Sequence, residues 1–360
     1  MSLKITSAIL ATGSYLPKNI VPNNEFLEHR FFEKNGEPIQ TKNVDIISKF
    51  QDITEIEERL YADTDHMASD LGTFAALEAL NSGNINPETL DYIIVAHNFG
   101  DVPLSGNRPV VIPTLASRIK HNLRIQNPDC VAYDIPFGCP GWLQGMIQAD
   151  YYIKSGDVKR VMVIGTETLS RVTDPHDRDS MIFGDGAGAT ILEGRPDTGS
   201  GIRSHKTQTH TVKEAYYLYT EKSSNPDHLS DELFLKMDGR KIYEYALINV
   251  PLVIKQSIDK SGYDIRDVKK VLVHQANGKM DEAILKRLFK LYGITDIPQD
   301  VMPMTIAKFG NSSVATIPTL LDLMFKKELK GHEFNPGDVI VFASVGAGMN
   351  INAMVYKFPD

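Results

Sequence analysis

The segment Tyr133-Asp-Ile-Pro-Phe-Gly-Cys-Pro-Gly-Trp142 joins an apolar strand to a helix at Cys139, and this junction indicates the class of fold. Helical spacing of Trp142, Met146 and Ile153 follows the cysteine. The pattern predicts a thiol on the first turn of a buried helix, where unpaired N–H groups and the helix dipole favour the thiolate. Two interpretations follow: a reactive nucleophile, or a packed core cysteine.

Strands and helices alternate on both sides of this junction, which predicts an α/β fold with a mixed, buried sheet. The further predicted elements are strands at 4–11, 90–96 and 160–165, and helices at 63–81, 110–121 and 313–327. Segments 31–43 and 196–231 are rich in polar residues, Pro and Gly, and we expect irregular surface loops there.

The second half of the chain loosely repeats landmarks of the first half, in the same order. The matched landmarks are apolar strands followed by His and Asn at 90–98 and 268–277, and glycine-rich runs at 183–192 and 345–354. The repeat predicts a duplicated fold with two pseudo-twofold-related halves, residues 1–196 and 197–360. Equivalent helix ends would then face each other, with Cys139 near Asn311. Coincidence among short α/β units is the alternative.

Composition limits the function. The chain has 360 residues with 42% hydrophobic content, enough for one large core or two fused cores. A net charge of -8 argues against general nucleic-acid binding. Two cysteines are too few for a disulfide framework or a four-cysteine zinc site, and they fit a reducing cytosol. With neither a secretory signal nor a membrane-length apolar run, we expect a cytoplasmic protein without a membrane partner.

Two polar residues in the second half fit chemistry with a cysteine. His274 ends a predicted buried strand, where active-site residues of open α/β sheets lie, although a lone His there is more often structural. Asn311 begins a helix, so an N-cap is its alternative role. A thiolate attacks a thioester and holds the acyl group, and neutral His and Asn donors stabilise an enolate without being titrated.

A glycine turn adds a second set of hydrogen-bond donors. The turn Gly346-Ala347-Gly348 lets the backbone approach a substrate closely. We expect the amide groups of Cys139 and Ala347 to form an oxyanion hole for the thioester oxygen.

These motifs resemble those of the thiolase-like condensing enzymes, specifically β-ketoacyl-acyl-carrier-protein synthase III, over nearly the whole chain. The segments in family order are 11–17, 133–142, 174–178, 183–188, 274–277, 310–318 and 346–348. The resemblance implies the thiolase-like layered α-β-α-β-α fold. It also implies a catalytic triad of Cys139, His274 and Asn311.

The resemblance implies a homodimeric acyltransferase without metal or cofactor, which performs ping-pong decarboxylative Claisen condensation. An acyl group from acyl-CoA or acyl carrier protein would load onto Cys139. Malonyl-acyl carrier protein would then condense with it, release CO2 and give a β-ketoacyl thioester for fatty-acid or related biosynthesis.

Further site residues follow from the same resemblance. Gly239 and Asn277 would line the pantetheine tunnel, Arg178 would contact adenine, and Ile112 would reach the partner subunit's pocket. The basic residues expected to receive the acidic carrier protein are Lys279, Lys286, Arg287 and Lys290. An ordinary solvated helix face is the alternative for these four.

The chain departs from the family near residue 50. The family's Trp, followed by Arg-Thr-Gly-Ile, is absent, and residues 46–53 read Ile-Ile-Ser-Lys-Phe-Gln-Asp-Ile. Because that Trp stacks on the adenine of coenzyme A, the acyl donor stays open between acyl-CoA and an acyl carrier protein.

Other relatives fit the sequence less well. Thiolase needs a second cysteine late in the chain, and this sequence has none. Elongating synthases use two histidines, whereas the second position here is Asn311. Hydroxymethylglutaryl-CoA synthase needs a glutamate base, and Glu167 is interpreted as the end of a strand instead. A type III polyketide synthase also uses Cys, His and Asn and stays open, as does a cysteine thioester hydrolase. An inactive paralogous subunit would need none of the three residues.

Overall fold

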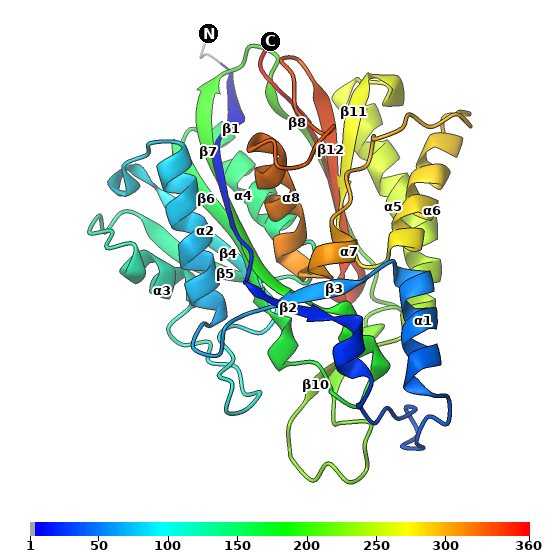
Figure 1. The fold of residues 1–360 in the computed structure, drawn as a ribbon. Helices are drawn as coiled ribbons and strands as arrows, with labels where there is room; N and C mark the ends of the chain where they lie inside the picture. Colours follow the sequence, from blue (N-terminus) through cyan, green and yellow to red (C-terminus); the bar gives the residue numbers. More distant parts are fainter. Residues whose placement is uncertain (1–3) are drawn as a thin grey trace.

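A five-stranded and a four-stranded β-sheet organise residues 4–360, the part of the chain that this computed structural model describes (Figure 1). The first sheet has the order β1-β7-β6-β4-β5. Its strands are β1 (Ile5–Tyr15), β4 (Tyr92–His97), β5 (Val131–Pro136), β6 (Arg160–Thr168) and β7 (Asp185–Pro196). The second sheet has the order β11-β12-β13-β8. Its strands are β8 (Gly201–Thr209), β11 (Val268–Val273), β12 (Val339–Gly346) and β13 (Asn350–Lys357).

Helices cover both sheets and fill the space between them, as Figure 1 shows. The outer helices of the first sheet are α2 (Ala68–Ser82) and α3 (Leu115–Asn122), and those of the second are α5 (Gly239–Ser261) and α6 (Gly278–Lys290). Between the sheets lie α4 (Gly141–Ser155) and α8 (Thr316–Phe325), whose buried side chains pack against strands of both. This order of layers confirms the predicted α-β-α-β-α fold.

Shorter elements surround the carboxyl ends of the central strands. They are α1 (Asn43–Thr54), α7 (Ile306–Phe309), β2 (Asn19–Pro22) paired with β3 (Glu58–Tyr61), and β9 (Leu218–Glu221) paired with β10 (Phe234–Met237). Short 3-10 helices are η1 (Asn23–Phe26), η2 (Pro87–Thr89), η3 (Leu169–Arg171), η4 (Arg178–Ile182), η5 (Ile265–Asp267), η6 (Ser313–Ala315) and η7 (Ala347–Met349). Within residues 4–360, no helix combines the length and apolar character that crossing a membrane requires.

The two sheets share one pairing pattern. In each, a parallel pair (β4 with β6, β11 with β12) is followed by two antiparallel pairs, which end at β1 and β8 respectively. The boundary expected near residue 196 falls between β7 and β8. These facts support the duplication, whose common origin stays a prediction.

The expectation that residues 196–231 form one irregular loop is wrong. Residues 201–209 are β8, an edge strand that pairs antiparallel with β13, and residues 218–221 are β9. Edge strands face solvent on one side and tolerate polar residues. Because Ile202 is the only aliphatic side chain in β8, the hydrophobic alternation that marks a strand is too weak to detect.

Backbone contact joins β6 to the turn that precedes α8. A Cβ atom placed on Gly165 would lie 2.2 Å from the carbonyl oxygen of Val314. Only glycine permits this approach. The contact places residues 311–315 beside the strand ends of the first sheet.

We therefore expect Gly165→Ala to lower the free energy of unfolding by about 3 kcal/mol, since overpacking against backbone has no easy relaxation. Gly106→Ala is the matched control, because a Cβ there has no neighbour within 4 Å, and it should change stability by less than about 0.5 kcal/mol. Urea unfolding of both variants measures the difference. Equal unfolding midpoints would contradict the tight contact.

Candidate active site

A sharp turn between β5 and α4 carries Cys139. Gly138 has φ 70°, and a Cβ on it would lie 2.8 Å from the backbone nitrogen of Ala347. Helix α4 begins at Gly141, with Pro140 as its N-cap, so the sulfur lies just before the helix rather than on its first turn. The turn therefore places the thiol at the end of the central helix layer.

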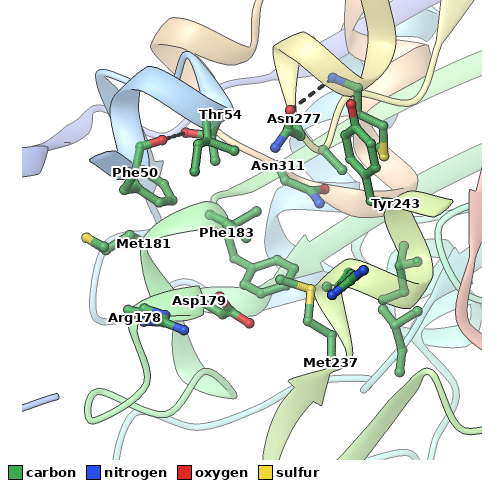
Figure 2. Close-up of a pocket in the computed structure, with 18 of the residues that line it drawn as sticks. Phe50, Thr54, Arg178, Asp179, Met181, Phe183, Met237, Tyr243, Asn277 and Asn311 are labelled. Atoms are coloured by element: carbon green, nitrogen blue, oxygen red, sulfur yellow. Dashed lines mark hydrogen bonds between the residues drawn. The ribbon is translucent and has the colours of Figure 1, made fainter. Parts of the chain in front are cut away.

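One cavity of about 610 Å³ brings together the three predicted catalytic residues, Cys139, His274 and Asn311; Asn311 is labelled in Figure 2. They come from different parts of the chain: the turn after β5, the end of β11 and the segment before η6. Arg178, Gly239 and Asn277, all predicted to contact substrate, also line it. Apolar side chains including Phe50, Phe183 and Met237 form much of the remaining wall.

His274 is held at the end of β11. Its backbone N–H donates to the carbonyl of Ala343 at 2.8 Å, and the neighbouring Gln275 side chain bonds Pro303 and Thr305. The residue is only 5% exposed. Burial lowers the pKa of its imidazole to about 4, so the ring is neutral at physiological pH. Its Nδ1 atom has no hydrogen-bond partner within residues 4–360.

Asn311 links the two halves through its backbone. Its N–H donates to Ile182 and its carbonyl accepts from Gly184, both at 2.9 Å. The side-chain oxygen accepts from the Ser313 N–H at 2.8 Å in a local turn, although the N-cap of η6 is Ser312 and not Asn311. Because that contact occupies the amide oxygen, the NH2 end of Asn311 is the end suited to a ligand in the cavity.

The expectation that the helix position favours the Cys139 thiolate is wrong for the protein at rest. Burial raises the pKa of the thiol to about 11, against smaller opposite effects of a hydrogen bond from Ser313 and of the backbone N–H of Cys139 itself. Desolvation penalises the charged sulfur more than these donors stabilise it. Cys139 is therefore a thiol until a substrate arrives.

The turn at 346–348 touches the cysteine turn directly. A Cβ on Gly346 would lie 2.5 Å from the backbone nitrogen of Cys139. Together with the contact between Gly138 and Ala347, this places the two backbone amides of the predicted oxyanion hole on adjoining segments. Their role stays a prediction.

A second cavity of about 760 Å³ shares Cys139, Phe183 and Leu218 with the wall of the first. It is lined by Asn98, Phe99, Leu169, Phe183, Ala215, Tyr216, Leu218, Tyr219, Thr220, Leu235, Ser313 and Ala347. Most of this wall carries no recognisable sequence signal, because the segment that contains β9 resembles an irregular loop rich in polar residues, Pro and Gly. The signal for Asn98 was its place beside His97 in the repeated strand-end motif.

The segment that departs from the family lies on α1, at the wall of the first cavity. Ile46, Lys49, Phe50 and Ile53 of this helix line the cavity. Arg178 lines the same cavity and lies 3.8 Å from Glu33 in an exposed ion pair. The rim thus offers a cation beside apolar and aromatic side chains.

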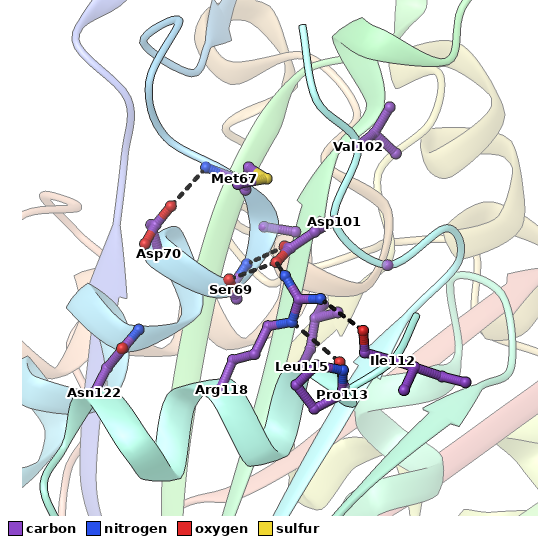
Figure 3. A network of polar contacts seen from close by, with 12 residues as sticks. Met67, Ser69, Asp70, Asp101, Val102, Ile112, Pro113, Leu115, Arg118 and Asn122 are labelled. Atoms are coloured by element: carbon purple, nitrogen blue, oxygen red, sulfur yellow. Dashed lines mark hydrogen bonds and ion pairs between the residues drawn. The ribbon is translucent and has the colours of Figure 1, made fainter. Parts of the chain in front are cut away.

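Ile112 lies outside both cavities and is 84% exposed. Its loop is tied down by Arg118, which donates to Asp101 at 2.7 Å and to the Pro113 carbonyl at 3.0 Å (Figure 3). Asp101 also accepts from the backbone and side chain of Ser69. The loop therefore presents a fixed apolar side chain, and its contact with a partner subunit stays a prediction.

The basic helix α6 begins at the first cavity. Asn277, which lines the cavity, caps it by accepting from the Met280 N–H at 3.0 Å. The four predicted carrier-protein contacts, Lys279, Lys286, Arg287 and Lys290, are all exposed. Lys286 pairs with Glu282 at 2.6 Å.

Comparison with known proteins agrees with this geometry. Residues 133–211 match the family model described as 3-Oxoacyl-[acyl-carrier-protein (ACP)] synthase III, and residues 258–358 match its C-terminal model. The β-ketoacyl-[acyl-carrier-protein] synthase III of Staphylococcus epidermidis is 31% identical over 347 residues, which are 96% of this chain and 97% of that protein. The chain belongs to the β-ketoacyl-acyl-carrier-protein synthase III family. It is a thiolase-like condensing enzyme and an acyltransferase of the synthase III type.

Solved structures of synthase III proteins share its fold. The enzyme from Aquifex aeolicus VF5 aligns with TM-score 0.78 and 29% identity, covering 98% of this chain and all of that one. The priming β-ketosynthase of the R1128 polyketide pathway aligns with TM-score 0.81 at 23% identity, covering 100% and 98% of the two chains. The second match shows the fold alone.

The raised pKa of Cys139 predicts how this synthase III-type site reacts with iodoacetamide. Because only the thiolate is alkylated, the rate at Cys139 should keep rising from pH 7 to 9 without a plateau, less steeply where Glu167, whose pKa burial raises to about 8, ionises near the sulfur. His274, neutral above pH 4, should add no inflection between pH 5 and 8. Mass spectrometry of the modified peptide follows the rate, and Cys139→Ser controls for Cys130, which is 1% exposed. A plateau near neutral pH would instead indicate a resting thiolate.

Proposed function

We propose that this chain catalyses the decarboxylative Claisen condensation of an acyl thioester with malonyl-acyl carrier protein, through an acyl-Cys139 intermediate, in fatty-acid or related biosynthesis. The observation that carries the proposal is the place of Cys139 in the walls of two cavities, with His274 and Asn311 in the wall of the first. One cavity suits the arm that delivers a thioester. The other suits the acyl chain left on the sulfur.

In the first half-reaction, the Cys139 sulfur attacks the thioester carbonyl while the amides of Cys139 and Ala347 hold the oxyanion. The bond to the donor's sulfur breaks, and the departing thiolate takes up the proton that Cys139 loses. The adjoining turns at 138–139 and 346–347 support this role, since oxyanion donors must be rigid and close together.

In the second half-reaction, the malonyl group loses CO2, and the electron pair of the broken C–C bond forms an enolate. His274 and Asn311 donate hydrogen bonds to the enolate oxygen. The enolate carbon then attacks the acyl-Cys139 carbonyl and expels the sulfur as thiolate, which takes up a proton from water. Burial lowers the pKa of His274 to about 4, so the ring is neutral, and its remaining N–H is too weak an acid to be lost when it donates to the enolate; this supports the assignment.

The substrates would occupy the two cavities in different ways. The pantetheine arm would pass Gly239 and Asn277, with Arg178 at the rim as a contact for a coenzyme A donor. The acyl chain would enter the second cavity, whose wall includes Phe99, Leu169 and Leu235. Apolar side chains favour an alkyl group there by the hydrophobic effect.

The proposal extends to the partners of the enzyme. The proposed enzyme works as a cytoplasmic homodimer, with Ile112 entering the partner subunit's pocket. An acidic acyl carrier protein would dock on α6, whose basic side chains lie beside the cavity wall formed by Asn277 and Met280.

We expect Cys139→Ser to form no acyl-enzyme, and His274→Ala to be acylated but to release CO2 from malonyl-acyl carrier protein at least about 100-fold more slowly. Intact-protein mass spectrometry with a panel of acyl-CoA donors identifies the acyl group, and labelled malonyl thioester measures CO2. His121→Ala, an exposed histidine on α3, should behave like the unchanged protein.

Normal condensation by His274→Ala would overturn the assigned role. Release of free acid without malonyl thioester would favour a thioester hydrolase. Repeated condensation on coenzyme A thioesters without carrier protein would favour a type III polyketide-synthase-like acyltransferase.

The double substitution Lys286→Glu and Arg287→Glu should raise KM for malonyl-acyl carrier protein about tenfold, since it replaces two cations with anions on the docking helix. KM for the acyl-CoA donor should change less than twofold. The matched control is Lys327→Glu with Lys330→Glu, an equal charge change past the end of α8. Steady-state kinetics at low and high salt measure the effect, and equal KM values in both doubles would reject docking at α6.

A further inference from the structure

Ser313 lies against all three residues of the proposed triad. Its hydroxyl is 3.3 Å from the Cys139 sulfur, and its backbone N–H holds the Asn311 side chain. Its backbone also lies against the His274 imidazole, where it partly offsets the effect of burial on that pKa. The serine is 3% exposed, so water does not compete for these contacts.

Ser313 donates a hydrogen bond to the Cys139 sulfur, and Asn98 supports this direction. The Asn98 Nδ2 atom donates to the Ser313 hydroxyl oxygen at 2.9 Å. This contact occupies one of the two lone pairs of the oxygen and leaves the hydroxyl proton for the sulfur.

Glu167 fixes the orientation of Asn98. One carboxyl oxygen of Glu167 accepts from the Asn98 backbone N–H at 2.9 Å and also from its side-chain amide. A flipped amide would point its oxygen at that acceptor oxygen and lose both side-chain donations. The donors thus run in one direction, from Asn98 to Ser313 to Cys139, with Glu167 as the anchor.

The end of β4 holds Asn98 in place. His97 accepts from the Gly100 N–H at 2.9 Å through Nδ1, so its proton is on Nε2, which lies 3.0 Å from Asp134. Ser313 itself has φ 52°, a left-handed conformation that non-glycine residues rarely adopt. A strained residue at such a position is kept in place by its surroundings and is found mostly at functional sites.

We propose that Ser313 is a catalytic residue whose hydroxyl stabilises the Cys139 thiolate as it forms and as it leaves, and that Asn98 and Glu167 are its positioning residues. The proposal rests on the proposed function only in taking Cys139 as the nucleophile. In a buried site, each donor to sulfur offsets part of the desolvation that disfavours the thiolate. The same contact acts in both half-reactions, since each has sulfur carrying negative charge.

Alkylation of Cys139 by iodoacetamide between pH 7 and 9 tests this without any acyl substrate. Ser313→Ala should lower the rate about tenfold at every pH, and Asn98→Ala about threefold. Ser312→Ala is the matched control: the neighbouring buried hydroxyl lies 3.3 Å from that of Thr316, and the rate should stay within twofold. Ser313→Gly removes the hydroxyl while accommodating the positive φ, and should react like Ser313→Ala.

An unchanged alkylation rate in Ser313→Ala would overturn the proposal. A normal alkylation rate in Ser313→Gly together with a slow rate in Ser313→Ala would also overturn it, because the defect in Ser313→Ala would then come from backbone strain and not from the lost hydroxyl. Should Ser313→Ala fail to fold, Ser313→Gly and Asn98→Ala decide the question, and normal rates in both would reject it. A failure of condensation with malonyl thioester would not affect this readout, so the two proposals fail separately.

Discussion

Direct contact between backbone segments from the two halves is the constraint on which the site depends. The cysteine turn meets the turn at 346–348 through Gly138 and Gly346, and the strand β6 meets the turn before α8 through Gly165. At each place a Cβ atom would lie less than 3.0 Å from backbone atoms. Because these contacts leave no room for a side chain, the two halves are fixed in one relative position. The positions of the residues that form the cavity walls are fixed with them.

Burial at this junction determines the chemistry. His274 is buried and Cys139 is partly buried, and desolvation leaves both uncharged at rest, the first by a lowered pKa and the second by a raised one. Burial also raises the pKa of the neighbouring Glu167 to about 8. Such a site favours reactions in which charge develops only on a bound substrate and is met by preorganised donors. Acyl transfer and enolate formation are reactions of this kind.

Much of the fold and the centre of the site could be predicted from residue patterns. The strand-to-helix junction at Cys139 and the strand that ends at His274 are local features, detectable by apolar runs and turn residues. β8 escaped detection because an edge strand carries little hydrophobic signal. The departure at residues 46–53 was visible as an absent motif, but its location on α1 in the cavity wall was not.

The order of residue types along the chain was sufficient to identify the family, the layered fold and the three residues that line the cavity. Local sequence also indicated a helix beside the thiol, which predicted a thiolate. Only the tertiary structure decided the protonation of Cys139 and the direction of its hydrogen bond from Ser313. The reason is physical: desolvation and hydrogen-bond direction depend on groups far apart in the chain, such as Asn98, and these meet only when both halves fold together.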